Sequence, residues 1–580
     1  MKTDNMEQLR HSLAHLLAAA VLELWPDTKR AIGPAIDNGF YYDFEFPQPI
    51  SEEDLPKIEE KMREILKSWD KFEQTEVSTE EAKKIFSGNP YKLELIKEYA
   101  ASGLTTVKSG DFVDLCRGGH IDSAKDIKPD AFKLTHMAGA YWRGSEKNKM
   151  LTRIYGAAFE NKKALEEYLK IQEEAKKRDH KKLGVDLDLF TFSDLVGAGL
   201  PLWTPKGTIV RNLLDDFIWD LRQKRGYQKV EIPHITKKDL YEKSGHWDKF
   251  ANELMKIETR EKHLFAMKPM NCPHHTQIFA RKPHSYRDMP QRYSNTTMVY
   301  RDEQTGELSG LSRVRAITQD DAHVFARHNQ IKEEILKIWD IVDEFYGAFG
   351  FPLEVRLSLH DPQQKEKYLG SPKLWNDAED TLREIAKGKK VTALEALGEA
   401  AFYGPKVDFV ARDSLGRQWQ VATIQLDMNM PERFDLYCIN ENGEQERVVM
   451  LHAATMGSTE RFLSIIIEHF AGAFPVWLAP VQVIIAPISD KFSDYAKKIK
   501  QELVDAGLRV ELDERQESVG KKIREAELQK IPYTLVVGEK EQTANTVAVR
   551  KRGTGDLGAI PVEKFIQNIQ EESQQKKSSQ

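Results

Sequence analysis

Apolar residues recur along the 580-residue chain with a spacing that changes between regions. Residues 51–69 carry Leu55, Ile58, Met62 and Leu66 at three- and four-residue steps, which predicts an amphipathic helix. Residues 162–184 are rich in charge and end at a glycine, which predicts a connecting helix. These two patterns bracket a mixed N-terminal region that ends near residue 160.

A large α/β region follows, from about residue 185 to residue 475. It contains a long helix followed by a strand near "VEIP" (230–233). Two further strand-like runs, "TTMVYRDE" (296–303) and "VRAITQDDAHVF" (314–325), are joined by the turn-rich "QTGELSGLS". These runs predict a hairpin, on which side chains two residues apart point to the same face.

Beyond "FPVWLAP" (474–480) the pattern changes to short alternating strands and helices. This region predicts a small α/β domain of about 100 residues with a mainly parallel sheet. The predicted strands are "VQVIIA", "RVEL", "YTLVV" and "TVAVRKR", and the predicted helices span 489–506, 518–530 and 562–572.

Composition narrows the class of protein. Hydrophobic residues make up 40% and charged residues 30% of the chain, as in globular proteins. With no apolar run of about 18 residues and a polar start, we expect neither a membrane span nor a secretory signal. Three cysteines cannot form a disulfide framework, which favours a reducing cytoplasm.

The net charge of −6 does not indicate a nucleic-acid partner, so such a partner requires local basic patches. Two candidates are "KKRDHKK" (176–182) and "VRKRG" (549–553). On charge alone, each is more simply interpreted as a solvated surface run.

Histidine and cysteine occur in two short segments. "HSLAHLL" places His11 and His15 four residues apart, and "DLCRGGH" does the same for Cys116 and His120. This spacing leaves open a metal site, a nucleophile with its base, or no site.

The predicted hairpin carries arginines 301, 313 and 315 opposite acids 302, 303, 320 and 321. Cross-strand salt bridges would explain this pattern. However, "MGSTERFL" (456–463) adds an arginine at the start of a predicted helix, which suits a phosphate group. The sequence has no GxxxxGK[ST] loop, so a bound nucleotide would be held by arginines instead.

"PHI" after the long helix, "YRDE…SRVR" and "GSTERF" resemble the three signature motifs of class II aminoacyl-tRNA synthetases. Six segments in order, "SGHWDKF", "MKPMNCPHH", "TQDDAHVF", "FYGPKVDF", "RQWQVATIQLD" and "GSTERF", are similar to bacterial-type threonyl-tRNA synthetases. The resemblance covers nearly the whole chain. Because "HSLAH" begins at residue 11, we expect the family's small ubiquitin-like N-terminal domain to be missing.

The resemblance implies an α/β multidomain protein. It implies an α+β editing domain (1–160), a linker helix (161–184) and a catalytic antiparallel sheet flanked by helices (185–475). A C-terminal α/β anticodon-binding domain (476–573) and a disordered tail (574–580) would follow. Such a protein activates L-threonine with ATP, transfers it to tRNA(Thr) and hydrolyses mischarged seryl-tRNA(Thr). The first motif, at Pro233, implies a homodimer.

The resemblance also assigns residues to the catalytic site. Arg301, Glu303, Arg313 and Arg461 would bind ATP with Mg²⁺, and one zinc ion per subunit would be held by Cys272, His323 and His452. Spacing alone does not indicate that zinc site. Threonine would contact Gln319, Asp321, Tyr403, Lys406 and Gln425.

Two further sites follow from the resemblance. Serine would be removed by a pocket of His11, His15, Lys92, Asp114, Cys116 and His120, for which metal-free hydrolysis is preferred over a metal site or a vestigial cluster. The anticodon would be read by Arg524, Glu541 and Arg550.

The chain departs from the family pattern at Ile317, where an aromatic residue usually stacks on adenine, and at Ala453, where arginine is more usual. We therefore expect an active enzyme with weakened ATP binding. The competing interpretations are another class II synthetase such as a prolyl enzyme, an RNA-binding regulator without catalysis, and a stand-alone deacylase.

Overall fold

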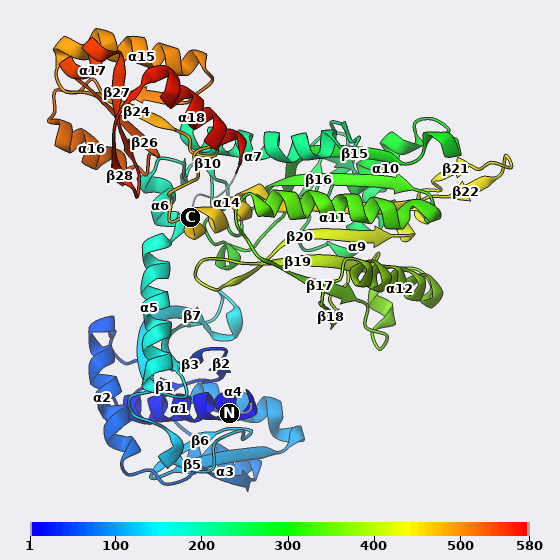
Figure 1. Cartoon of the computed structure of the whole chain (residues 1–580). Helices are drawn as coiled ribbons and strands as arrows, with labels where there is room; N and C mark the ends of the chain where they lie inside the picture. The colour runs from blue at the N-terminus through cyan, green and yellow to red at the C-terminus, as the bar shows by residue number, and fades with distance from the viewer. Residues whose placement is uncertain (1–2, 577–580) are drawn as a thin grey trace. The chain divides into compact units, whose positions relative to one another are not determined.

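The computed structural model describes residues 3–576, which form two compact units, Met1–Glu174 and Ala175–Gln580. Figure 1 labels their helices and strands along the chain. Among the described residues, no helix combines the length and apolar character that crossing a membrane requires.

The first unit packs a long helix, α1 (Thr3–Leu24), and the amphipathic α2 (Leu55–Leu66) against an antiparallel sheet. The predicted apolar face of α2 is confirmed, since Leu55, Ile58, Met62 and Leu66 are all buried. The sheet runs in the order β1 (Lys29–Arg30), β3 (Gly39–Glu45), β8 (Met150–Ala158) and β7 (Phe132–Tyr141), with β2 (Ala35–Ile36) beside β3.

A second, three-stranded sheet lies in the same unit. It is formed by β4 (Glu73–Val77), β5 (Leu104–Ser109) and β6 (Phe112–Leu115). The helices α3 (Thr79–Ile85) and α4 (Pro90–Tyr99) lie between β4 and β5 in sequence, and each begins after a side-chain cap, Ser78 and Asn89 respectively.

The expected connecting helix is interrupted. α5 (Lys162–Arg178) ends before Asp179, whose side chain caps a second helix, α6 (His180–Asp186). Gly184 therefore does not end a helix but lies inside α6, where the ring of Phe190 leaves no room for a Cβ atom. The single helix predicted over 162–184 is wrong because Asp179 caps a new helix start, which the continuous charge pattern hid.

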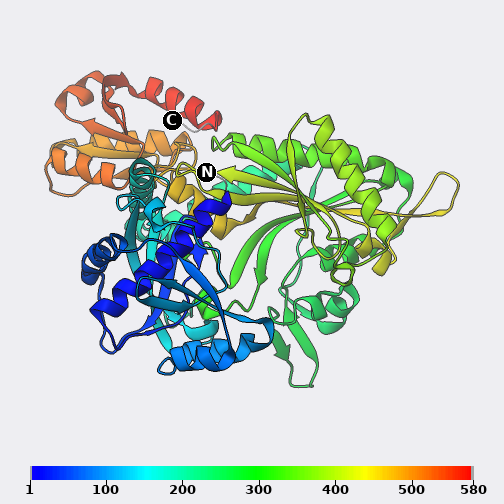
Figure 2. The same ribbon diagram turned by 90° about the horizontal axis from the view of Figure 1, so that it is seen from below.

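The second unit is organised by an eight-stranded, mostly antiparallel sheet. Its order is β11 (Gln228–Lys229), β15 (Gln291–Tyr300), β16 (Ala316–Ala326), β23 (Val449–Ser458), β20 (Gln418–Asp427), β19 (Lys406–Arg412), β17 (Leu353–Leu359) and β18 (Ala393–Leu397). Only the two edge pairs, β11–β15 and β17–β18, are parallel. Figure 2 shows the strong twist of these strands.

Helices bury one face of this sheet. α11 (Ile331–Gly347) runs along β16, β20 and β23, and α7 (Pro205–Gln223), α12 (Pro372–Gly388) and α14 (Thr459–His469) complete the layer (Figure 1). Shorter elements before and between the central strands are α8 (Lys238–Ser244), α9 (His246–Lys249), α10 (Cys272–Ala280), α13 (Asn429–Arg433), β12 (Ile235–Lys237), β13 (Lys256–Glu258) and β14 (Leu264–Met267).

The predicted hairpin is confirmed as β15 and β16, but its strands are shorter than expected. Pairing stops at Tyr300 opposite Ala316, so the arginine- and acid-rich residues lie in a long loop. The backbone N–H of Asp302 donates to Glu253 O (2.9 Å), and that of Arg315 donates to Gly199 O (2.8 Å). Because these groups bond to other segments, strand alternation does not govern where the loop side chains point.

The C-terminal region contains the sheet β25 (Val510–Leu512), β24 (Val483–Pro487), β26 (Tyr533–Val537), β27 (Thr546–Lys551) and β28 (Gly555–Pro561). Only β24, β25 and β26 are parallel to one another; β27 and β28 form an antiparallel hairpin. The sheet is therefore less parallel than predicted. Its helices are α15 (Ser493–Asp505), α16 (Val519–Leu528), α17 (Glu539–Ala544) and α18 (Val562–Gln574).

The expected disordered tail is only partly open to comparison. Residue 574 still belongs to α18, and the Lys576 ammonium lies 4.2 Å from the ring centroid of Phe217. Residues 577–580 lie outside the described residues.

Candidate active site

One row of residues crosses four neighbouring strands of the large sheet. His323 on β16 lies opposite His452 on β23, which lies opposite Gln425 on β20, which lies opposite Lys406 on β19. Directly opposed residues project from the same face. The register therefore brings together four residues that are far apart in the sequence.

Cys272, His323 and His452 form a buried group that could hold a metal ion. Their ligand atoms all lie within 4.8 Å of one another, although His323 and His452 are 129 residues apart in sequence. His323 Nε2 and His452 Nδ1 are 3.0 Å apart. Two nitrogens bound tetrahedrally at about 2.0–2.1 Å from one zinc ion would be separated by roughly 3.3 Å, so the observed spacing suits a shared metal.

The other nitrogen of each imidazole has its own partner. His452 Nε2 lies 2.9 Å from Asp427 Oδ2, and His323 Nδ1 lies 2.7 Å from His275 Nδ1. Such partners orient metal-binding imidazoles and leave the opposite nitrogen for the ion. Asp427 and His275 were not identified from the sequence; His275 stands three residues after Cys272, which was the available signal.

Burial raises the pKa of the Cys272 thiol well above its usual range, and the nearby Asp321 and Asp427 add to this effect. A cysteine left without an ion would therefore be a neutral thiol. One cysteine and two histidines are ligands that zinc prefers, and three protein ligands leave a position for substrate. The donor set thus fits zinc.

The predicted threonine-binding residues lie around this group. Asp321 Oδ1 is 3.7 Å from His323 Nε2, and the rings of Tyr403 and His452 are 5.1 Å apart. Asn271, another residue that the sequence did not single out, donates to Asp321 Oδ2 (3.0 Å). The remaining members are also engaged: Gln425 Nε2 donates to Gly404 O (3.1 Å) and Lys406 Nζ lies 2.9 Å from Asp408 Oδ2.

A cavity of about 460 Å³ contains all four residues predicted to bind ATP. Its volume is within the range of small-molecule sites. Its lining comprises Val299, Arg301, Glu303, Ser312, Arg313, Val314, Ile317, Gln319, Gly457, Ser458 and Arg461. Ile317, which replaces the family's aromatic residue, thus lies where it would meet a bound nucleotide.

Positive charge dominates this cavity. Arg313 Nη2 lies 2.7 Å from Glu303 Oε2, whereas the Nε of Arg301 is buried without a partner among the described residues. Burial lowers the pKa of Arg461, which stands in the first turn of α14. Three guanidinium groups against one carboxylate favour a polyanionic ligand such as a polyphosphate.

The remaining hairpin acids are not paired with the loop arginines. Asp320 Oδ2 lies 3.0 Å from Arg222 Nη2 and also accepts the backbone N–H of Thr455 (2.9 Å). Burial raises the pKa of Asp320 to about 6. This buried pair ties α7 to the central strands and was not anticipated from the sequence.

In the first unit, His11, His15, Cys116 and His120 lie together, again with ligand atoms within 4.8 Å of one another. Cys116 Sγ is 3.5 Å from His11 Nε2 and 3.3 Å from His120 Nε2. Ser12 Oγ donates to Gln8 O and accepts from Ile121 N, so its 3.3 Å contact to His120 Nδ1 is accounted for by an Nδ1–H donor. His120 Nε2 is then an acceptor for the Cys116 thiol.

Burial keeps this cluster uncharged at neutral pH. It lowers the pKa of His120 to about 3 and that of His11 below its usual range, and it raises the pKa of the Cys116 thiol to about 11. Reactive cysteines need a lowered pKa, so Cys116 lacks the character of a nucleophile. Neutral imidazoles retain the lone pair that a general base requires.

Lys92 and Asp114 lie beside the cluster as a buried ion pair, with Nζ 2.8 Å from Oδ1. Burial alone would raise the pKa of Asp114, but the cations of Lys92 and Arg30 hold it well below its usual range. Tyr42 donates to the second carboxylate oxygen (2.5 Å). The structure thus brings all six predicted residues of this second site together.

The three predicted anticodon residues lie on different elements. Arg524 belongs to α16, Glu541 to α17 and Arg550 to β27. Glu541 Oε2 accepts the backbone N–H of Gly538 (2.9 Å), and Arg550 Nη1 lies 3.4 Å from Asp556 Oδ2. In residues 3–576 no direct interaction joins the three.

Comparisons with known proteins place these sites in a family. A model of the "tRNA synthetase class II core domain (G, H, P, S and T)" matches residues 255–470, and an "Anticodon binding domain" matches 482–572. The "Threonyl and Alanyl tRNA synthetase second additional domain" matches 104–155. A threonine–tRNA ligase of Porphyromonas gingivalis is 49% identical over 97% of this chain and 87% of its own length. The chain belongs to the threonine–tRNA ligase family.

Other members of the threonine–tRNA ligase family give the same result. The protein of Gloeobacter violaceus is 47% identical over 98% of this chain and 92% of its own. The crystal structure of the RNA binding domain of threonyl-tRNA synthetase from Cryptosporidium parvum Iowa II has a TM-score of 0.65 and 36% identity, and covers 68% of this chain and 98% of that chain. These relatives exclude the prolyl interpretation and confirm the predicted fold class.

Proposed function

We propose that this threonine–tRNA ligase forms threonyl-adenylate in the cavity lined by Arg301, Arg313 and Arg461. The chain is an aminoacyl-tRNA-forming enzyme: it activates L-threonine with ATP, in the presence of Mg²⁺ as in its class, and transfers it to tRNA. The observation that carries the site assignment is the meeting of three arginines in one cavity beside a buried Cys–His–His group. The domain limits predicted from the sequence are part of the proposal.

In this proposal Arg301 binds the α-phosphate and the threonine carboxylate, where negative charge builds up during adenylate formation. An oriented cation in a partly buried site stabilises such charge more than water does. Arg313 and Arg461 bind the outer phosphates. Glu303, now paired with Arg313, accepts the adenine amino group, so nucleotide binding exchanges one of its partners.

Cys272, His323 and His452 are proposed to hold one zinc ion per subunit. When bound, the ion supplies a Lewis-acid position for the amino and hydroxyl groups of the amino acid. Asp321 then accepts the hydroxyl hydrogen of threonine. Valine has no hydroxyl and would leave that buried carboxylate without its partner, so the site rejects valine strongly.

Serine retains the hydroxyl and lacks only a methyl group. One methyl group is worth about 1–3 kcal/mol, so fit alone discriminates by roughly 10–200-fold. We propose that the cluster of His11, His15, Cys116 and His120 removes serine from mischarged tRNA without a metal ion. Its neutral imidazoles orient a water molecule, and no acyl-cysteine intermediate is needed.

Replacing His11 with alanine is expected to slow deacylation of seryl-tRNA(Thr) about 100-fold, the lower end of a general base's contribution. Threonine-dependent ATP–pyrophosphate exchange should remain unchanged, because the cavity for ATP lies in the other unit. Cys116→Ala should retain deacylation within about tenfold. Complete loss of deacylation in Cys116→Ala alone would refute the proposed non-nucleophilic role of the thiol.

A homodimer is proposed from an exposed apolar segment at the start of the second unit. Leu195 is 100% exposed, and Val185, Phe192, Val196 and Leu202 are each at least 40% exposed. Adjacent exposed apolar residues of this kind mark interaction surfaces. The segment lies around the short strands β9 (Phe190–Thr191) and β10 (Leu202–Trp203).

Leu195→Asp is expected to weaken dimerisation at least tenfold, because a carboxylate would be buried in place of an apolar side chain. Sedimentation equilibrium measures the effect. Leu394→Asp is the matched control, since Leu394 is 62% exposed on the edge strand β18. Equal dissociation constants for the two variants would contradict the proposed interface.

Arg524, Glu541 and Arg550 remain proposed contacts to the anticodon. The arginines can form bidentate hydrogen bonds with guanine. Glu541 would have to give up or share its bond to Gly538 N to accept from a base.

The experiment that tests the function is amino-acid-dependent ATP–pyrophosphate exchange with threonine, serine, valine and proline, with and without a zinc chelator. We expect exchange with threonine, weaker exchange with serine, none with valine or proline, and loss after zinc removal. Full exchange after zinc removal would refute the zinc assignment. No exchange with any amino acid at high ATP would identify Ile317 as the cause of a damaged adenine site.

A further inference from the structure

His180 connects the linker to the loop that carries Arg313. The residue begins α6 and is 3% exposed. Its Nδ1 lies 2.6 Å from Glu468 Oε1, and its Nε2 accepts the backbone N–H of Leu311 (3.1 Å). Since an amide N–H can only donate, Nε2 carries the lone pair and Nδ1 carries the proton given to Glu468. Both ring nitrogens are thus in use, which argues against a metal site at Asp179, His180 and Glu468.

The loop approaches His180 through a tight turn. The backbone N–H of Ser309 donates to Arg313 O (3.1 Å), and Gly310 between them has φ +51°. A Cβ atom on Gly310 would lie 2.4 Å from His180 Nε2. Leu311 is fully buried, so its N–H has no access to water and depends on the imidazole. The imidazole therefore fixes the position of the turn.

This turn supplies one wall of the cavity assigned to ATP. Ser312 and Arg313, the next two residues, both line it. Ser312 Oγ lies 3.0 Å from Ser464 Oγ, and Ser464 Oγ donates to Arg461 O (2.7 Å). Helix α14, which carries Glu468, therefore also carries the opposite arginine of the cavity.

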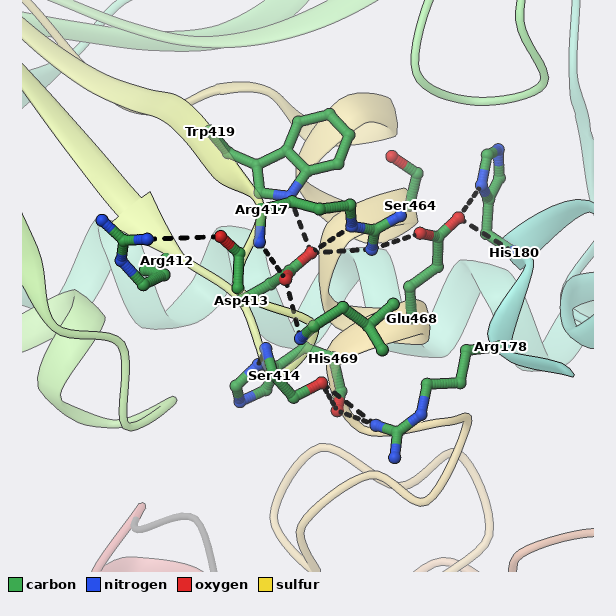
Figure 3. Close-up of polar contacts among 12 residues, drawn as sticks. Arg178, His180, Arg412, Asp413, Ser414, Arg417, Trp419, Ser464, Glu468 and His469 are labelled. Carbon is green, nitrogen blue, oxygen red and sulfur yellow. Dashed lines mark hydrogen bonds and ion pairs between the residues drawn. The ribbon is translucent and has the colours of Figure 1, made fainter. Parts of the chain in front are cut away.

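A second set of contacts leads from Glu468 to the same cavity, and Figure 3 shows its polar members. Glu468 Oε2 lies 2.6 Å from Arg417 Nη2, and Arg417 Nε donates to Asp413 Oδ2 (2.7 Å). Trp419 Nε1 donates to the same oxygen (2.9 Å). The Arg461 guanidinium lies 5.9 Å from the ring centroid of Trp419. Both sides of the cavity are thus connected to one His–Glu pair.

We propose that His180 is a positioning residue for ATP. Its neutral imidazole holds the Ser309–Arg313 turn, and its partner Glu468 holds the support of Arg461, so that both arginines meet the phosphates. The inference rests on the assignment of this cavity to ATP. It assigns to the linker residue a role in nucleotide affinity, and none in contact with threonine.

Two isosteric variants separate the two bonds of the imidazole. His180→Asn places an amide near Nδ1 and can still donate to Glu468, but it does not reach Leu311. His180→Gln extends to the position of Nε2 and can accept the Leu311 N–H. We expect H180N to raise the KM for ATP in pyrophosphate exchange about five- to tenfold, because a buried N–H loses its acceptor. H180Q should remain within about twofold, and the KM for threonine should not change in either variant.

The chain provides a matched control. His360 repeats the same arrangement with Glu379, since its N and Nδ1 lie 2.8 and 2.7 Å from Glu379 Oε1. His360→Asn should lower the thermal midpoint about as much as H180N but leave the KM for ATP unchanged. An equal rise in the KM for ATP in H360N, or in H180Q, would overturn the proposal.

Two measurements keep the test decisive. If H180N does not fold, Ser464→Ala removes the second connection of the turn and should raise the KM for ATP about twofold to fivefold. An unchanged KM in Ser464→Ala would then refute the role of these contacts. Arg301→Ala is assayed in parallel: if exchange persists undiminished in that variant, the assignment of the cavity to ATP is at fault rather than the role of His180.

Discussion

Replacing His323 with alanine is expected to lower the zinc content from one ion per chain to below about 0.1 and to reduce threonine activation more than 100-fold. His323 is buried between His452 and His275, and its loss leaves two ligands on opposite sides of a gap. Substitutions of residues that merely orient a ligand already cost about 10–100-fold in metal affinity or activity. Loss of a ligand itself should exceed that range. Metal analysis and threonine-dependent pyrophosphate exchange measure the two effects.

His284→Ala is the control for loss of a buried imidazole. His284 is 3% exposed and its Nε2 lies 3.0 Å from Phe279 O, away from the Cys–His–His group. Its variant should retain zinc and threonine activation, even if it unfolds at a lower temperature. A His323→Ala protein that keeps stoichiometric zinc would show that the metal, if any, is bound elsewhere.

Arg301→Ala is expected to lower kcat for threonine-dependent exchange about 1,000-fold. Removing one group that stabilises developing negative charge typically costs 100- to 1,000-fold, and here the group carries a full charge. The Arg301 Nε is buried without a partner among the described residues, so the side chain is prepared for an incoming anion. The effect should appear mainly in kcat, because the charge on the α-phosphate rises in the transition state.

Arg301→Lys should recover only part of this loss, because an ammonium group cannot form two parallel hydrogen bonds to one phosphate or carboxylate. Arg287→Ala is the control: that arginine lies 5.5 Å from the ring centroid of Tyr286 and does not line the cavity. Full recovery in the lysine variant would show that Arg301 contributes charge without bidentate geometry.

Much of the local structure could be predicted from the sequence because it depends on neighbouring residues. The apolar spacing of α2 and the turn-rich segment between β15 and β16 are signals of this kind. The break at Asp179 and strand β28 were missed, because a charged helix pattern continues across the first and glycines interrupt the alternation of the second.

The composition of the metal group could not be derived from spacing. His323 and His452 meet only because β16 and β23 pair in one particular register, and no local pattern specifies this. Family resemblance supplied the residues, and the structure shows that they converge. The same applies to the loop arginines, whose directions follow from backbone bonds to Glu253 and Gly199 rather than from strand periodicity.

The row that crosses β19, β20, β23 and β16 has a consequence for which insertions and deletions the chain can tolerate. One residue added within β23 before His452 would turn its imidazole to the opposite face of the sheet. The same addition in the exposed turn near Gly443, between β21 (Tyr437–Ile439) and β22 (Gln445–Arg447), would leave the row intact. Length variation among homologous chains should therefore be confined to such turns, while the four central strands keep a constant length between their site residues and their pairing partners.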